Sequence, residues 1–571
     1  MNIRQLSGTR LWRFRGVGTA LVLYCGAVFG QAAPGAGDIL QTLPSPVVRP
    51  DPGLKIDDTF SRAKAITDVE GMQLDIKGFR ITGMTVVQEA EVKEVLAPFI
   101  GPNKRFQDLL DAAAALKREL AGRGYFLADV IVPEQKIVDG IVELRVLEGR
   151  LGKVRLEVDP EVSISRSLLE SYLGSLQEGG PIRTADVERA LFQIHDLRGV
   201  VARSSFSPGA TPGTADLTIK VSRGKAFDAN LDFDANGSIY TGQHRAGAGV
   251  DANSLMGMGE LLSLRATNAI DGNLRFARMS ALIPVGPWGS KIGAAYSELK
   301  YRLGTSQFEA LKAGGNAEVE SVTAIHPFVR SRNTNLLTIF QYDKRKLRDI
   351  QQASGKEVRK INDVSSLTLS GDFRDRVFGG GINIFNISYT LGELKYADPT
   401  LPADRLNERM FSKTNLTLSR LQAVSERLAL YGAFSQQFTN KNLDPSEKFS
   451  LGGPNAVRAY PQGEGSGDEG YFATLETRYR LPYEDSLPGS LVMTAFYDFG
   501  RSILIKIPSA QDIALGTSLR RRIAGPGIGI NWEVPNDWYL RGTMAFRDTT
   551  KATADHLLRY PLFYFQFNKF F

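Results

Sequence analysis

The chain contains few of the residues that metal sites and disulfide frameworks require. Its 571 residues include a single cysteine, and its four histidines are scattered at His195, His244, His326 and His556. This scarcity excludes most metal enzymes, zinc ribbons and disulfide scaffolds. Apart from one window near the N-terminus, no apolar run approaches about 18 residues, so a polytopic helical membrane protein is excluded. With 43% hydrophobic residues, the chain is also too apolar to be disordered.

The exceptional N-terminal window has the features of an export signal. Four arginines precede an apolar stretch, Gly16–Phe29, and the small residues around Ala32 suit a signal peptidase. The stretch of about 14 residues fits a signal peptide better than a membrane-spanning helix, which stays the alternative. Cys25 suggests a lipoprotein, but the bulky Tyr24 before it argues against one. We therefore expect a signal peptide over 1–32 and a mature chain without cysteine.

The segment 33–71 is rich in proline and aspartate. It contains one apolar helical candidate, Asp38–Leu43, with Ile39, Leu40 and Leu43 as its apolar residues, and prolines follow from Pro44 onward. Proline-rich chain is extended and semi-rigid. The segment is predicted to be a short helix on a tether.

Residues 72–224 show a mixed α/β pattern that occurs twice. In the first copy, the apolar residues alternate as in strands at Leu74/Ile76 and at Val142/Leu144/Val146. Between these strands, Leu109, Ala113, Leu116 and Leu120 lie on one face of a helix. In the second copy the corresponding sets are Val154/Leu156/Val158, Leu169/Tyr172/Leu173/Leu176, Val187/Leu191/Ile194 and Leu217/Ile219/Val221. The pattern predicts two β-α-α-β-β domains of about 75 residues, 72–149 and 150–224.

From residue 225 onward the helical period disappears and apolar and polar residues alternate. Phe227, Leu231 and Phe233 share one face of such a strand, while Asp232 belongs to the other. The chain ends in an aromatic strand that places Phe563, Phe565, Phe567 and Phe571 on one face. Repeated strands of this kind in an exported chain predict a transmembrane β-barrel over 225–571, with a β-sandwich as the alternative. At about 20–23 residues per strand and loop, roughly 15–17 strands fit, and the even-number rule favours 16.

A glycine-rich segment interrupts the strands. It runs over Asn442–Tyr460 and continues to Glu476, and its distinctive residues are Gly452, Gly453, Val457, Arg458, Ala459, Tyr460, Gly467, Asp468 and Gly470. No Gly-Lys-Ser/Thr follows, so a phosphate-binding loop is not predicted. An ordinary long loop is the alternative to a functional one.

The whole mature chain resembles the translocators of two-partner secretion systems, which export haemolysins and filamentous adhesins. Several short motifs carry this resemblance in the family's order: Gly124-Tyr125, Pro133-Glu134-Gln135, Asp139-Gly140, Glu148-Gly149, His326-Pro327 with Arg330, Val457-Arg458-Ala459-Tyr460, and Phe496-Tyr497-Asp498-Phe499-Gly500. Ala459 departs from the family's glycine at this position of the loop signature. Since alanine resists positive φ, the departure puts the loop backbone in question.

The resemblance implies a fold and a function. The fold is an outer-membrane barrel of 16 antiparallel strands, preceded by two periplasmic polypeptide-transport-associated (POTRA) domains and a helix that plugs the pore. The function is export of a large adhesin, haemolysin or toxin, which carries an N-terminal secretion domain and crosses unfolded through the lumen without nucleotide hydrolysis. Arg458 is expected to pair with Asp498 beside Phe496. The implied partners are outer-membrane lipid and, through the strand ending at Phe567 and Phe571, the barrel-assembly machinery.

Other functions remain as alternatives. The first is a barrel-assembly insertase of the same superfamily, which generally has more than two POTRA copies. The second is a porin, which does not account for the two α/β domains. An enzyme embedded in the barrel is poorly supported, because the sequence contains no catalytic constellation. No cofactor is predicted. The net charge of +7 could suggest nucleic acid, but no basic helix or basic–aromatic module supports such a partner.

Overall fold

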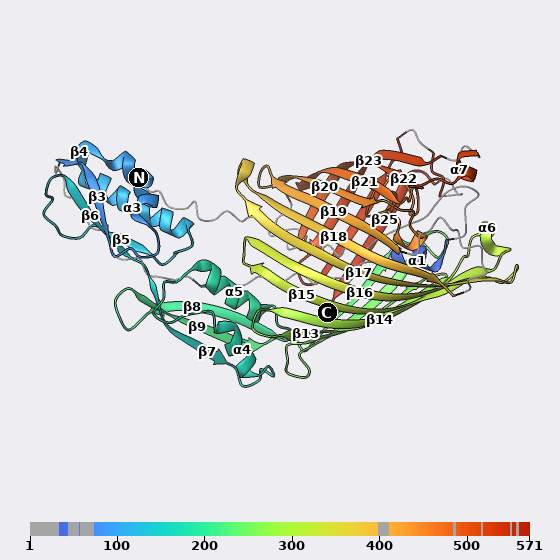
Figure 1. The fold of residues 1–571 in the computed structure, drawn as a ribbon, viewed down its shortest axis with the longest axis horizontal. Helices are drawn as coiled ribbons and strands as arrows, with labels where there is room; N and C mark the ends of the chain where they lie inside the picture. Colours follow the sequence, from blue (N-terminus) through green and yellow to red (C-terminus); the bar gives the residue numbers. More distant parts are fainter. Residues whose placement is uncertain are drawn as a thin grey trace.

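The structure is a computed structural model that describes residues 34–43, 56–57, 73–397, 410–482, 487–514, 518–548, 551–554 and 559–571. The predicted signal peptide, and most of the proline-rich segment after it, lie outside these residues. Two small α/β domains lead into one end of a large barrel (Figure 1). No helix in the described part of the chain is long and apolar enough to cross a membrane.

The first α/β domain contains strands β2 (Gln73–Ile76), β3 (Gly78–Thr82), β4 (Gly101–Arg105), β5 (Asp129–Ile131) and β6 (Ile141–Leu147), and helices α2 (Glu89–Leu96), η1 (Ala97–Phe99) and α3 (Phe106–Gly122). Its main sheet has the order β3-β6-β5. The predicted helix face is confirmed, because Leu109, Ala113, Leu116 and Leu120 are all buried. The predicted β-α-α-β-β order is wrong for this domain, because two strands precede α2 and β4 lies between the helices. Helix α2 and strands β3 to β5 have too few apolar residues in a regular spacing to be located individually from the sequence.

Motif residues of this domain tie its loops to its sheet. The Glu148 carboxylate accepts hydrogen bonds from the backbone N–H groups of Thr85 and Val86. The Gln135 side chain pairs with the backbone of Glu143 through both its amide oxygen and its amide nitrogen, at 2.7 and 2.9 Å. These residues therefore have structural roles within the domain.

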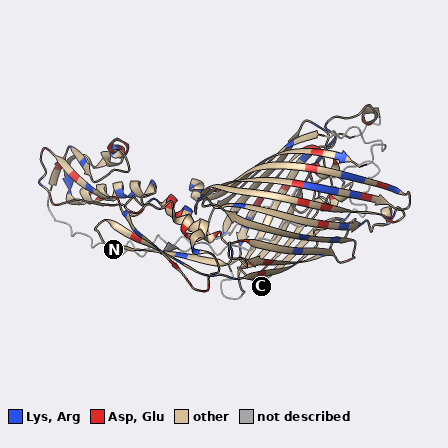
Figure 2. Ribbon diagram, turned by 60° about the horizontal axis from the view of Figure 1, so that its bottom comes forward, with Lys and Arg blue, Asp and Glu red and all other residues tan. Residues whose placement is uncertain are grey.

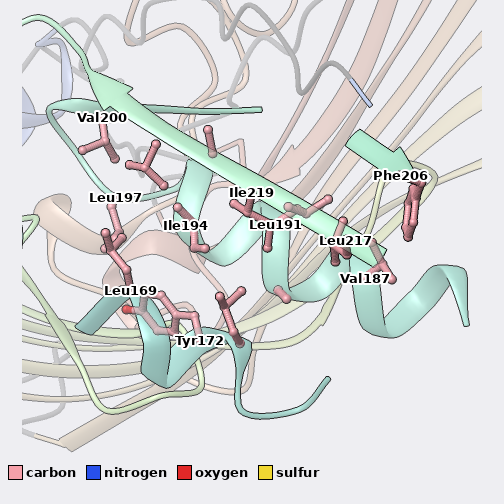
Figure 3. Close-up of a cluster of buried hydrophobic side chains, with 14 of the residues drawn as sticks. Leu169, Tyr172, Val187, Leu191, Ile194, Leu197, Val200, Phe206, Leu217 and Ile219 are labelled. Atoms are coloured by element: carbon pink, nitrogen blue, oxygen red, sulfur yellow. The ribbon is translucent and has the colours of Figure 1, made fainter. Parts of the chain in front are cut away.

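The second α/β domain contains β7 (Arg150–Val158), α4 (Arg166–Leu173), α5 (Thr184–His195), β8 (Val200–Pro208) and β9 (Thr214–Arg223). The short strand β1 (Ile56–Asp57) pairs in parallel with β8, and the sheet order is β1-β8-β9-β7. Both helices pack one apolar face against β8 and β9 (Figure 3). The β-α-α-β-β order is as predicted, but α4 ends before Leu176, because the chain leaves the helix at its C-cap, Gly174.

Sixteen antiparallel strands close the barrel, as predicted. They are β10 (Phe227–Asp234), β11 (Arg245–Asn253), β12 (Leu261–Ala269), β13 (Leu274–Val285), β14 (Ser290–Arg302), β15 (Ala313–Arg330), β16 (Thr334–Gln351), β17 (Lys356–Asp375), β18 (Gly381–Tyr396), β19 (Met410–Ala423), β20 (Leu428–Thr439), β21 (Glu469–Arg480), β22 (Ser490–Ile503), β23 (Arg520–Val534), β24 (Trp538–Ala545) and β25 (Leu562–Phe570). Short helices α6 (Ser306–Glu309), η2 (Val377–Gly379) and α7 (Ala510–Ala514) lie between strands.

The alternation of side chains explains the two surfaces of the barrel. On β10, Phe227 and Leu231 are exposed on the outer surface, whereas Asp232 and Asp234 are buried on the inner one. The last strand, β25, pairs with β10 and so closes the cylinder. Phe571 follows β25, and its backbone N–H donates to the carbonyl of Ala229. The terminal aromatic residues thus lie at the seam.

The N-terminal helix lies inside the barrel (Figure 1). Helix α1 spans Ala36–Gln41, so the predicted span Asp38–Leu43 is two residues too late at both ends. The helix begins earlier because Asp349 on β16 accepts a hydrogen bond from the backbone N–H of Ala36 at 2.6 Å. It ends earlier because the residues before Pro44 are disfavoured from helical geometry.

Candidate functional site

The loop between β20 and β21 folds into the lumen. A cluster of its apolar side chains is almost completely buried against the barrel wall: Phe449, Leu451, Val457, Ala459 and Tyr460. Burial of this much apolar surface favours one position of the loop. The glycine-rich segment is therefore a packed element inside the barrel.

Arg458 joins this loop to the inner wall. Its Nε donates to Asp498 Oδ2 and its Nη2 donates to Asp498 Oδ1, each at 2.8 Å. Its Nη1 donates to Glu476 Oε2 at 3.1 Å. The backbone N–H of Arg458 also donates to Asp498, at 3.0 Å. A bidentate guanidinium–carboxylate pair of this kind fixes orientation as well as distance.

The surroundings of this ion pair keep it out of water. Asp498 on β22 is 0% exposed, and the Arg458 side chain is 15% exposed. The guanidinium lies 3.3 Å from the ring centroid of Phe496, an arrangement that adds cation–π attraction. Glu476 on β21 accepts a further hydrogen bond from Arg478. Two arginines thus balance two carboxylates, and the group as a whole carries no excess charge.

Ala459 fits the loop without strain. Its backbone does not have a positive φ, so this position of the loop does not require the family's glycine. Its methyl group occupies space beside Gly525 on β23, where an added Cβ would lie 2.5 Å from the Cβ of Ala459. The substitution is accommodated because Gly525, which lies next to Asp498 on the neighbouring strand, has no side chain at that point.

The other signature residues hold the two ends of the loop. Gly453 has φ of +126°, which favours glycine. An added Cβ at Gly467 would lie 2.3 Å from the carbonyl oxygen of Ile503. The Asp468 carboxylate accepts from the backbone N–H groups of Leu443 and Lys506, at 2.9 and 2.8 Å. These contacts tie the loop to itself and to the segment after β22.

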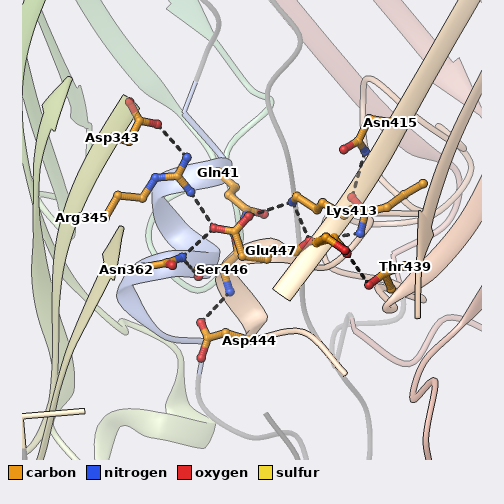
Figure 4. Close-up of polar contacts among 12 residues, drawn as sticks. Gln41, Asp343, Arg345, Asn362, Lys413, Asn415, Thr439, Asp444, Ser446 and Glu447 are labelled. Carbon is orange, nitrogen blue, oxygen red and sulfur yellow. Dashed lines mark hydrogen bonds and ion pairs between the residues drawn. The ribbon is translucent and has the colours of Figure 1, made fainter. Parts of the chain in front are cut away.

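A second polar network lies at the start of the loop, around the short helix η3 (Pro445–Glu447) (Figure 4). The Glu447 side chain is fully buried and accepts from Arg345 Nη1 at 2.8 Å and from Asn362 Nδ2 at 2.7 Å. Lys413 Nζ, also fully buried, lies 2.8 Å from the Glu447 carboxylate. Three strands, β16, β17 and β19, thus hold one glutamate. We name Glu447, Arg345, Lys413 and Asn362 the η3 latch.

Helix α1 rests on this part of the loop. Gly37 packs so closely that an added Cβ would lie 2.4 Å from the Cβ of Ser446. Gln41 donates to the carbonyl of Ser446, and Arg245, itself paired with Asp234, donates to the carbonyl of Thr42. The predicted plug residues Ile39 and Leu43 are buried with Tyr240, Leu299 and Leu347, while Leu40 is partly buried against them. The helix and the loop therefore fill the lumen together.

The structure brings together most of the predicted site residues, but in two groups. Arg458, Phe496, Asp498 and Glu476 are in direct contact. The plug residues Ile39, Leu40 and Leu43 pack elsewhere, against the inner wall of the barrel. Phe567 and Phe571 lie at the barrel seam, apart from both groups. Sequence reasoning missed the η3 latch, although a cluster such as Asp444, Glu447 and Lys448 before an apolar stretch is a usable signal. In the described part of the chain, no group of His, Cys, Asp and Glu is arranged to hold a metal.

Comparison with known proteins places this arrangement in a family. Residues 213–531 match the family described as "Haemolysin secretion/activation protein ShlB/FhaC/HecB". Residues 74–149 match the "POTRA domain, ShlB-type". The chain is 28% identical over 473 residues to the heme/hemopexin transporter protein HuxB of Haemophilus influenzae, covering 81% of this chain and 82% of that protein. It is 19% identical over 479 residues to the outer membrane transporter CdiB of Dickeya dadantii, covering 82% and 83%.

Solved structures have the same fold. CdiB from Escherichia coli is similar with a TM-score of 0.65 and 18% identity, over 90% of this chain and 93% of that chain. BamA from Haemophilus ducreyi, lacking POTRA domains 1–3, is similar with a TM-score of 0.51 and 15% identity, over 88% and 100%.

Proposed function

The chain belongs to the family of haemolysin secretion/activation proteins named for ShlB, FhaC and HecB, and from this premise we propose that it exports one large exoprotein across the outer membrane. The barrel spans the outer membrane, and the POTRA domains lie in the periplasm. Relatives are named as transporters connected with heme/hemopexin and haemolysin. The client is accordingly an adhesin, haemolysin or toxin with an N-terminal secretion domain.

One observation carries the proposal: two elements, helix α1 and the loop on which it rests, occupy the lumen of a closed barrel. Helix α1 is held by Asp349, Arg245 and Ser446, and the loop is held by Asp498. Neither element belongs to the hydrogen-bonded sheet of the barrel, so each can leave its place without unfolding the barrel. Such a barrel is suited to a gated conduit and not to a pore that is permanently open.

On the proposed path, the client meets the POTRA domains, 72–149 and 150–224, before the barrel, 225–571. The segment 33–71 contains the plug helix that the client displaces. The client reaches the POTRA domains as an extended chain and pairs with an open sheet edge, where unpaired N–H and C=O groups are available. It then enters the lumen as α1 and the loop leave. Folding of the client outside the cell drives it forward, with no catalytic step and no nucleotide hydrolysis. The terminal strand with Phe567 and Phe571 is the part that the barrel-assembly machinery recognises.

Deletion of the gene tests this proposal against its main rival, an insertase for other barrels. We expect loss of one large protein from the medium or cell surface and an unchanged set of outer-membrane barrels, measured by comparing the secreted and outer-membrane protein profiles. A broad loss of barrels would support the insertase instead.

A further inference from the structure

Three arginines lie side by side on the outer surface of β22 and β23. Arg501 is directly opposite Arg522, and Arg520 is opposite Ile503, one position farther along the same face. All three side chains are exposed. Like charges placed directly opposite each other on a sheet destabilise it, so this arrangement requires a reason outside the sheet.

Within the part of the chain that the structure describes, the three guanidinium groups have no acidic partner. Among the described residues, no hydrogen bond or ion pair joins a carboxylate to Arg501, Arg520 or Arg522. Two outward-facing cations elsewhere on the barrel are paired: Lys300 lies 2.6 Å from Glu298, and Lys346 lies 2.6 Å from Glu320. The arginine cluster is therefore unlike these other cations of the outer surface.

The cluster lies at the outer edge of the apolar band. Strand β10 leaves the second POTRA domain and neighbouring strands alternate in direction, so β22 runs from the periplasmic side outward. Its outward-facing residues Met493, Tyr497 and Phe499 are exposed and apolar, and Arg501 follows them. Eight residues span about 27 Å along a strand, and a tilt of roughly 40° reduces this to about 21 Å. That height is close to the apolar band of a membrane barrel, which is about 25 Å tall.

Neighbouring features suit an interface with lipid headgroups. Strand β23 runs in the opposite direction, so its outward-facing Ala524, Pro526 and Ile528 follow Arg522 in the chain, and Arg522 again lies at their outer end. Tyr471 on β21 lies directly opposite Arg501, and tyrosine is enriched where a membrane meets water. Along the barrel strands, long uncharged stretches give way to charged ones toward the end away from the POTRA domains (Figure 2).

We propose that Arg501, Arg520 and Arg522 bind the phosphate groups of an anionic glycolipid in the outer leaflet. A guanidinium fork matches phosphate geometry, and several forks on one face can hold a headgroup that carries two phosphates. The bound phosphate removes the repulsion between Arg501 and Arg522. The proposal rests on the barrel spanning the outer membrane and not on what it exports.

Native mass spectrometry of the purified full-length barrel tests the proposal, with bisphosphorylated lipid A as the probe. We expect the Arg501→Ala/Arg522→Ala variant to bind lipid A at least about tenfold more weakly than the wild type, since each arginine provides charge-assisted hydrogen bonds. The matched control, Lys300→Ala, removes an outward-facing cation that is already paired and should bind as the wild type does.

Two further probes separate the sources of phosphate. Dephosphorylated lipid A should bind wild type and variant equally weakly, and millimolar inorganic phosphate should not displace lipid A. Equal binding of lipid A by the wild type and the double variant would overturn the proposal, as would displacement by inorganic phosphate, which would indicate a site for free anions. Heat-modifiable mobility on gels verifies folding, and Arg522→Gln replaces the double variant if that one does not assemble.

Discussion

Replacement of Arg458 should release the inward-folded loop while leaving the barrel intact. The structure sets the magnitude. Asp498 is fully buried, and without the guanidinium the one hydrogen-bond donor left to it among the described residues is the backbone N–H of residue 458. A buried charge that loses its partner costs about 3–5 kcal/mol. A solvated pair would cost only ~0–1 kcal/mol. The docked loop in Arg458→Ala is therefore expected to open at least about a hundredfold more often.

The mature chain without its signal peptide is expected to lack cysteine, so a single introduced thiol can report on the loop. Ala456→Cys places that thiol at a buried position of the loop, and its labelling by a soluble maleimide measures the open fraction. Arg458→Ala and Asp498→Ala should each accelerate labelling. They should also sharply reduce export, because export on the proposed path requires a loop that stays docked until the client enters. The double variant should be little worse than either single variant. The control Arg348→Ala removes an exposed pair with Glu357. Normal export by Arg458→Ala, or additive defects, would refute the reasoning.

Two further predictions concern the plug and its seat. Removal of residues 33–51 should raise the ion conductance of the purified protein in a planar bilayer, because α1 fills part of the lumen; unchanged conductance would mean that α1 is not the main plug. Glu447→Gln should raise conductance to a smaller extent, because it removes the charge that holds Lys413 and Arg345 while keeping the shape of the side chain. Glu357→Gln, which alters an exposed pair, is its control, and equal conductance of Glu447→Gln and wild type would argue against the η3 latch as the seat of the plug.

The regular parts of the fold were predictable because their side chains follow a simple period. The alternation of apolar and polar residues, as in Phe227–Asp234, shows which face of a strand contacts lipid. The length of one strand with its loop then limits how many strands the barrel segment can form. In the same way, the spacing of Leu109 and Leu116 reports one buried helix face. These signals are local and therefore readable along the chain.

Long-range contacts account for what the sequence did not reveal. The start of α1 depends on Asp349, more than 300 positions away. The η3 latch joins Glu447 to residues on three strands, and none of them is near it in sequence. Likewise, Ala459 is accommodated by Gly525 on β23, which is far from it in sequence. The pairing of Arg458 with Asp498 was expected only from the resemblance to a family, and its role in export stays a prediction.

The claim that the client crosses through the lumen is tested most directly by crosslinking during export. Thr368 and Leu367 are adjacent on β17, and Leu367 is exposed on the outer surface while Thr368 belongs to the opposite face, toward the lumen. With a client stalled by a fused folded domain, Thr368→Cys should form crosslinks to the client and Leu367→Cys should form none. Crosslinks from Leu367→Cys, or none from Thr368→Cys, would contradict passage through the barrel.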